Sequence, residues 1–183
     1  LMLTEYYAVR HRKNVLIMAT KTGQDAVWNP ELQEKLPELF GQFSNVLVRA
    51  HTDLTTQQGA DEIEHLAKRA DIIIIDEAHN FRNHGKNPTE ENPWGSRWWR
   101  MHEICRGKTV FLLTATPINN SLFDLVHQAE LFTGVDEDDH FASIGISSLR
   151  KYTIELEKPF KAAVPDSAAI AALMAQDKLF QSI

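Results

Sequence analysis

The chain has 183 residues, 43% hydrophobic and 24% charged, a composition that indicates a globular domain and excludes a disordered or fibrous protein. Its formal net charge of −6 excludes a global basic field, so any contact with nucleic acid must be local. The single cysteine, Cys105, excludes an internal disulfide and fits a reducing cytoplasm, and no apolar run reaches the roughly 18–20 residues that span a bilayer.

Short apolar runs alternate with helical patterns along the first 134 residues. Buried strands are expected at residues 14–20, 45–50, 71–76 and 109–114. In the third strand Asp71 is followed by four isoleucines, which can hide both faces of a strand at the centre of a parallel sheet. Strands and helices that alternate over short loops predict an α/β fold with right-handed crossovers.

Apolar stripes and capping residues predict the helices between these strands. Residues 3–12 read as the end of a helix, and the following helices are expected to begin at Asn29-Pro30, Thr55-Thr56, Ser96 and Asn119 and to end near residues 36, 70, 106 and 131. Residues 21–24 read as a turn, and residues 83–95 as a polar loop. Beyond Gly134 the pattern weakens to an acidic connector at 136–139, an ambiguous segment at 145–157 and a last helix capped by Asp166.

Two adjacent carboxylates and a histidine follow the isoleucine strand directly. Asp76 and Glu77 stand at its carboxyl end, and His79 comes two residues later. Ligands of open α/β sheets gather at this end of the strands. A carboxylate there can hold Mg²⁺ beside a phosphate chain, and a second one can orient or deprotonate an attacking water. The residues fit a Walker B arrangement, and the alternative for them is an acidic turn.

A second polar group follows the last strand. Thr114, Ala115 and Thr116 precede Pro117, which stops the strand and fixes the turn. The two hydroxyl groups can hydrogen-bond toward a neighbouring acid or to the backbone. We expect the ends of the strands at 71–76 and 109–114 to meet, which would place Asp76 beside the threonines.

Together these stretches resemble motifs II and III of the superfamily 2 helicase-like ATPases. The spelling DEAHNFRN at 76–83 and LLTATPINNSLFDL at 112–125 is most similar to the Swi/Snf-like branch. Residues 15–20, followed by Trp28, look like motif Ia of the family, and the resemblance covers about residues 14–134.

The resemblance implies a RecA-like parallel sheet with helices on both faces, followed by a helical C-terminal extension. Residues 1–134 would be a partial ATP-binding lobe, and residues 135–183 a connector toward an insertion or a second lobe. It also implies a DNA-dependent ATPase that moves on duplex DNA, with RNA as the other substrate to consider, and a prokaryotic cytoplasmic location, with no membrane.

The family's roles carry over onto the matching residues. Asp76 would hold Mg²⁺ on the phosphates of ATP, largely through water, and Glu77 would activate the hydrolytic water. His79 would sense the γ-phosphate. Thr114, Ala115 and Thr116 would couple hydrolysis to movement of the two lobes. Thr20 and Lys21 would contact a DNA phosphate, although a surface turn explains them equally well.

Two parts of such a motor have no counterpart in the sequence. No glycine-rich loop followed by Lys-Thr or Lys-Ser precedes Val15, and Lys21-Thr22-Gly23 has these letters in the wrong order. Residues 135–183 are too few for a second RecA-like lobe. The chain begins with Leu1 rather than methionine, and we expect a fragment of lobe one that is inactive alone.

Two other functions remain open. A non-catalytic RecA-like binding or regulatory module would also lack the phosphate loop. A metal-dependent phosphohydrolase would use Asp76 and His79 with other histidines, but no second His–Asp pair at ligand spacing supports it. Trp94, Trp98 and Trp99, interleaved with arginines, could stack bases, but a helix that buries them is the preferred interpretation.

Overall fold

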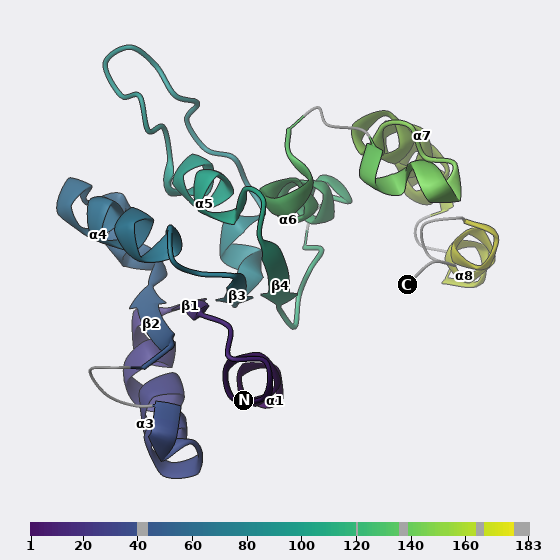
Figure 1. Cartoon of the computed structure of the whole chain (residues 1–183). Coiled ribbons are helices and arrows are strands. Elements are labelled where there is room, and N and C mark those ends of the chain that lie inside the picture. Colours follow the sequence, from purple (N-terminus) through teal and green to yellow (C-terminus); the bar gives the residue numbers. More distant parts are fainter. Residues whose placement is uncertain (40–43, 120, 136–138, 164–166, 178–183) are drawn as a thin grey trace.

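The computed structural model describes residues 1–39, 44–119, 121–135, 139–163 and 167–177. Within this part of the chain, four parallel strands form one sheet in the order β2-β1-β3-β4 (Figure 1). The strands are β1 (Val15–Ala19), β2 (Val46–Ala50), β3 (Ile72–Asp76) and β4 (Thr109–Leu113). All four predicted strands are confirmed, as is the α/β fold.

The isoleucine strand lies inside the sheet, as its composition predicts. Residues Ile73, Ile74 and Ile75 are fully buried because helices cover both faces of β3. Its neighbours are β1 and β4, and the register pairs Asp76 with Leu113. The carboxyl ends of β3 and β4 therefore lie side by side.

Two layers of helices enclose the sheet, and two further helices lie away from it. The helices are α1 (Met2–Thr4), continued by a π-helix (Glu5–Arg10); α2 (Lys21–Gly23), continued by a π-helix (Gln24–Trp28) and α3 (Asn29–Lys35); α4 (Gln57–Ala67); α5 (Arg97–Cys105); α6 (Phe123–Thr133); and the two outer helices α7 (Leu149–Ala163) and α8 (Ser167–Gln176). Single 3-10 turns span Pro37–Leu39, His51–Thr55, Ala78–Phe81 and Asp139–Ile144. One core joins α4, α5 and α6 to the sheet, and the other joins the N-terminal helix and α3 to its opposite face (Figure 1).

Side-chain caps begin the helices at two of the expected places. Thr56 accepts a hydrogen bond from the backbone N–H of Gly59, and Ser96 accepts one from that of Trp98. Satisfying these free amides fixes the first turns of α4 and α5. Both predicted starts are confirmed, and both helices end slightly before the predicted residues.

The helix after β1 differs from the expectation. It begins at Lys21 instead of Asn29, since Thr20 caps it by accepting a hydrogen bond from Gly23 N–H. The predicted turn at residues 21–24 is thus wrong. Pro30 lies inside the continuous helical segment, just after the π-helical turn, and it has no amide hydrogen to give to an α-helical bond.

Helix α6 also begins later than predicted, at Phe123 rather than Asn119. Asn119, in the turn before the helix, donates its N–H to the carboxylate of Asp124 in the first turn of α6. Ile118 is consequently 37% exposed and takes no part in the buried stripe predicted for it. Asn120, which belongs to the motif III spelling, lies outside the described residues.

The C-terminal part is helical, and α7 and α8 lie beyond α6, away from the sheet (Figure 1). The ambiguous segment at 145–157 includes the first turns of α7. The expected cap Asp166 and the connector residues 136–138 lie outside the described residues. In the described part of the chain, no helix is both long and apolar enough to cross a bilayer.

Candidate functional site

Asp76 lies at the carboxyl edge of the sheet, with one donor on each carboxylate oxygen. The indole Nε1 of Trp28 donates to Oδ2 at 2.8 Å, and the backbone N–H of Glu77 donates to Oδ1 at 3.0 Å. These two bonds fix the orientation of the carboxylate. Each oxygen keeps a further lone pair for a water or a cation.

Glu77, His79 and Thr114 form a chain of polar contacts across the two strand ends. Glu77 Oε2 lies 3.1 Å from Nδ1 of His79, and Thr114 Oγ1 lies 3.4 Å from the same nitrogen. Thr114 Oγ1 also accepts a hydrogen bond from the backbone N–H of Thr116 at 3.2 Å. The predicted meeting of the two strand ends is therefore seen directly, with the histidine between the carboxylate and the threonine.

The backbone turn that aims Glu77 is unusual for a glutamate. Glu77 has φ 52° and ψ 49°, in the left-handed region. The following 3-10 turn is held from two sides: Asn80 bonds the Glu77 carbonyl through both its backbone and side-chain nitrogens, and Arg97 donates to the Asn80 carbonyl at 3.0 Å. Phe81 is fully buried and anchors this turn in the core.

Thr20 and Lys21 lie at the end of the neighbouring strand, β1. Thr20 is occupied as the cap of α2, and the exposed Lys21 forms an ion pair with Asp25 at 3.1 Å. Gly23 packs against the same corner: a Cβ there would lie 3.0 Å from Thr20 Oγ1 and 3.9 Å from Asp76 Oδ2. The absence of a side chain at Gly23 keeps the space beside Asp76 open.

His51 lies beneath this site at the end of β2. Its ring is 2% exposed, packs edge-on against Phe81 with 5.0 Å between centroids, and has no partner in hydrogen-bond geometry for either nitrogen. Burial lowers the pKa of His51, and the Arg97 charge acts in the same direction, while Asp76 and the Met18 carbonyl oppose it. Burial of this ring therefore favours its neutral form.

The family model for the res subunit of type III restriction enzymes matches residues 4–119, more than half of the chain. The chain belongs to this family. The match spans all four strands and both polar strand ends, and it makes the chain a member of the helicase-like ATPases with a RecA-like α/β lobe. No curated protein matches the chain.

The sequence offers the tryptophans and arginines at residues 94–100 as a candidate for base stacking. Trp98 is buried, and Arg97 and Arg100 donate to the backbone carbonyls of Asn80 and Thr56. The interpretation as a packed helix is confirmed for this part. Trp94 is the exception, at 41% exposed beside Arg100.

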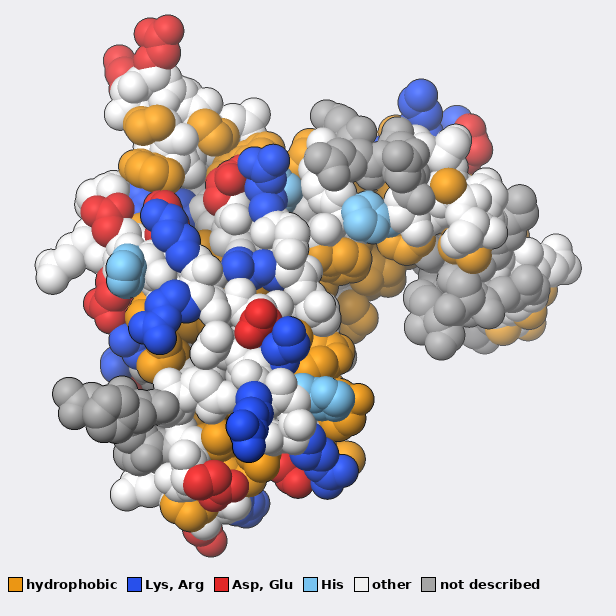
Figure 2. All heavy atoms as spheres, in the orientation of Figure 1, with side chains coloured by type: hydrophobic (Ala, Val, Ile, Leu, Met, Phe, Trp, Pro, Cys, Tyr) orange, Lys and Arg blue, Asp and Glu red, His pale blue; other side chains and the backbone are white. Residues whose placement is uncertain are grey.

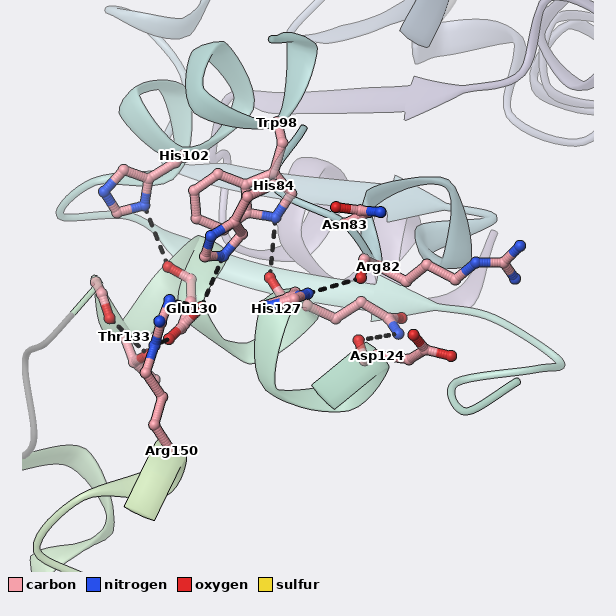
Figure 3. Close-up of polar contacts among 12 residues, drawn as sticks. Arg82, Asn83, His84, Trp98, His102, Asp124, His127, Glu130, Thr133 and Arg150 are labelled. Atoms are coloured by element: carbon pink, nitrogen blue, oxygen red, sulfur yellow. Dashed lines mark hydrogen bonds and ion pairs between the residues drawn. The ribbon is translucent and has the colours of Figure 1, made fainter. Parts of the chain in front are cut away.

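Two features of this res family chain are not predicted from its sequence. The bond from Trp28 to Asp76 joins residues 48 apart, which no local pattern reveals. A cluster of His84, His127 and Glu130 lies where the loop after Phe81 meets α6 (Figure 3). Its signal was the spacing of His127 and Glu130, three residues apart on a predicted helix, but the contribution of His84 depends on the tertiary fold.

Proposed function

We propose that the chain is the larger part of the first lobe of a DNA-dependent ATPase, Swi/Snf-like in its motifs, which moves on duplex DNA. Residues 1–134 form the partial lobe, and residues 135–183 connect it to an insertion or to the second lobe. The observation that carries the proposal is the contact chain Glu77–His79–Thr114. It links the water-activating carboxylate of one strand to the hydroxyl of the next.

The residues around Asp76 fit a magnesium ion and a phosphate chain. Asp76 has free lone pairs at the strand edge, and Gly23 leaves room beside it. Mg²⁺-bound ATP, the substrate that this family generally uses, supplies the phosphoanhydride to be cleaved. Asp76 would hold the ion, largely through water, and the bond from Trp28 keeps the carboxylate in place.

Glu77 activates the attacking water, and His79 transmits the position of Glu77 to Thr114. The Glu77 carboxylate orients the attacking water and accepts its proton. His79 shares one ring nitrogen between Glu77 and Thr114, so a shift of the glutamate changes the contact with the threonine. Thr114, Ala115 and Thr116 pass this change to α6, and thus to the movement of the lobes.

The edge of the sheet supports a longer parent protein. Among the described strands, β4 pairs with β3 alone, yet residues 110–113 are apolar and half-buried. Hydrophobic side chains line this margin of the body in Figure 2. An apolar edge strand is a liability unless another strand, a helix or a loop covers it. A strand that carries the phosphate-binding loop could pair there.

Contact with DNA is local in this proposal. Lysine and arginine side chains are interspersed with acidic ones over the face in Figure 2, and the net charge is −6. Thr20 and Lys21, at the carboxyl end of β1, are the proposed contacts to a DNA phosphate. Lys21 would exchange its exposed ion pair with Asp25 for that phosphate.

Replacement of the water-activating carboxylate tests the proposal. In the full-length parent, Glu77→Gln should retain ATP binding and lose DNA-stimulated turnover by at least about a hundredfold, the order of general-base effects. Exposed Glu90→Gln, in the polar loop, is the matched control and should turn over ATP as the parent does. Undiminished turnover in Glu77→Gln removes Glu77 from the mechanism, and a parent that binds ATP without cleaving it points to the regulatory module.

A further inference from the structure

Three side chains of the types that coordinate metals lie together on the side of the lobe that faces α7 (Figure 3). His84 comes from the loop after the turn Ala78–Phe81, and His127 and Glu130 come from one face of α6. One ring nitrogen of each histidine and a carboxylate oxygen of Glu130 lie within 4.8 Å of one another. We propose that these three residues form a binding site for Zn²⁺ or a similar borderline divalent transition metal.

His127 is oriented as a metal ligand would be. Its Nδ1 lies 2.9 Å from the backbone carbonyl of Arg82 (Figure 3). A carbonyl only accepts, so Nδ1 carries the hydrogen and Nε2 keeps its lone pair. Carbonyl partners of this kind commonly fix the tautomer of metal-bound histidines. Trp98 Nε1 donates to the His127 carbonyl at 3.0 Å and holds the backbone of α6 in place.

His84 has a buried nitrogen that lacks a hydrogen bond. Its Nε2 lies 2.7 Å from Glu130 Oε2, but the two atoms are not aligned for a hydrogen bond. The ring is packed between Trp98 and His127, with centroids 3.9 and 4.1 Å away. A buried polar atom without a bond requires an explanation, and a cation between this nitrogen and the carboxylate supplies one.

The donor set selects the metal. Two imidazole nitrogens and one carboxylate oxygen suit Zn²⁺ with a fourth position left open, whereas Mg²⁺ prefers oxygen ligands only. Bonds of about 2.1 Å in tetrahedral geometry place ligand atoms roughly 3.4 Å apart. Small rotations of the two rings would therefore close the site from its present separations.

Arg150 competes for the same carboxylate. Its guanidinium contacts both oxygens of Glu130, through Nε on Oε1 and through Nη2 on Oε2 at 3.1 Å. A second cation on one carboxylate lowers the affinity for the first. Removal of the Arg150 charge should therefore tighten metal binding. If Glu130 serves only to join Arg150 to His84, the same change should weaken the fold and produce no metal site.

Titration of the 183-residue chain with ZnCl₂ by calorimetry tests the site. We expect one Zn²⁺ per chain and no matching signal with MgCl₂. His127→Gln should weaken Zn²⁺ binding at least tenfold, since it removes one of three ligands. The matched control is His65→Gln, which removes an exposed histidine on α4 and should bind as the parent does. Arg150→Gln should bind Zn²⁺ more tightly than the parent.

Several outcomes would overturn the proposal. They are a parent chain without stoichiometric Zn²⁺ binding, a His127→Gln chain that binds as the parent does, or weaker binding in Arg150→Gln. Far-UV circular dichroism verifies that each variant is folded. If His127→Gln does not fold, Glu130→Gln, which keeps the shape and the acceptor oxygen, carries the same tenfold expectation.

Discussion

The backbone of Glu77 lies in a region that favours glycine, with φ 52° and ψ 49°. In that conformation the Cβ of any other residue crowds the following carbonyl oxygen. Hydrogen bonds maintain the conformation: Asn80 donates to the Glu77 carbonyl, and the Asp76 carboxylate accepts the backbone N–H of Glu77. Strain of this kind is found at functional sites, where it aims a side chain that a relaxed backbone would direct elsewhere.

A pair of substitutions that both remove the carboxylate measures this strain. The free energy of unfolding of Glu77→Gly should exceed that of Glu77→Ala by about 1–2 kcal/mol, because only alanine retains the crowded Cβ. Urea denaturation of the two variants of this chain provides the comparison. Equal stabilities, or a more stable alanine variant, would show that Glu77 is relaxed in solution.

His51 makes the stability of the chain depend on pH. Burial lowers the pKa of its ring in the folded state, so below the ordinary value of about 6.5 the unfolded chain takes up a proton that the folded chain resists. The stability from the buried neutral ring is therefore present above that pH and is lost as the pH falls. The loss approaches about 1.4 kcal/mol per pH unit for one proton.

The pH dependence of unfolding isolates this residue. His51→Gln should flatten the decline in stability as the pH falls below about 6.5, while exposed His65→Gln should leave it unchanged. Urea titrations at several pH values measure both slopes. Parallel profiles for His51→Gln and the parent would mean that the folded chain protonates His51 without cost.

Helix α6 is held at both ends by α7. At its start, the Glu157 carboxylate accepts hydrogen bonds from Leu122 N–H at 3.0 Å and from the Ser121 hydroxyl. Near its end, Arg150 pairs with Glu130. Burial raises the pKa of Glu130, but His84 and Arg150 together outweigh it, so the net pKa is lowered. The helix after motif III is thus tied to the C-terminal extension.

Loss of the contact at the start of α6 should be measurable in this chain. Glu157→Ala removes an acceptor and a negative charge from the helix N-terminus, and should cost about 1 kcal/mol of stability. It should also speed amide hydrogen exchange at Leu122. Glu155→Ala, an exposed glutamate on the same helix, is the control. Unchanged exchange at Leu122 would mean that α7 does not cap α6 in solution.

Local sequence signals predict most of the strands and helices, and the positions of the others depend on tertiary contacts. The isoleucine run and the caps Thr56 and Ser96 are readable because each acts within a few residues. The sequence predicts too late a start for the helix after β1 because Asn29-Pro30 is itself a good start signal, whereas only the geometry after β1 lets Thr20 cap the helix. Each of these two start signals can be recognised in the sequence by itself, but the sequence does not show which of them begins the helix.

The candidate site likewise combines contacts that the sequence predicts with contacts that depend on the packing of the whole molecule. That Asp76 meets the region of Thr114 follows from the general behaviour of parallel strands. That Trp28 bonds Asp76, or that Arg150 reaches Glu130, depends on how helices from distant segments pack. The functional roles of Asp76, Glu77, His79 and Thr114 stay predictions until turnover is measured.

The single cysteine reports on how the whole lobe opens. Cys105 lies in the core between α5 and the sheet, and burial raises the pKa of its thiol to about 12, with Lys108 opposing. Because the thiolate is the reactive form, the folded chain should resist thiol reagents at pH 8, whereas the unfolded chain should react fully. The rate with a disulfide reagent then follows opening of this core. A Cys105→Ala chain with Gln33→Cys on the exposed face of α3 is the control and should react at once. If the parent reacts as quickly, α5 does not remain packed against the sheet in solution.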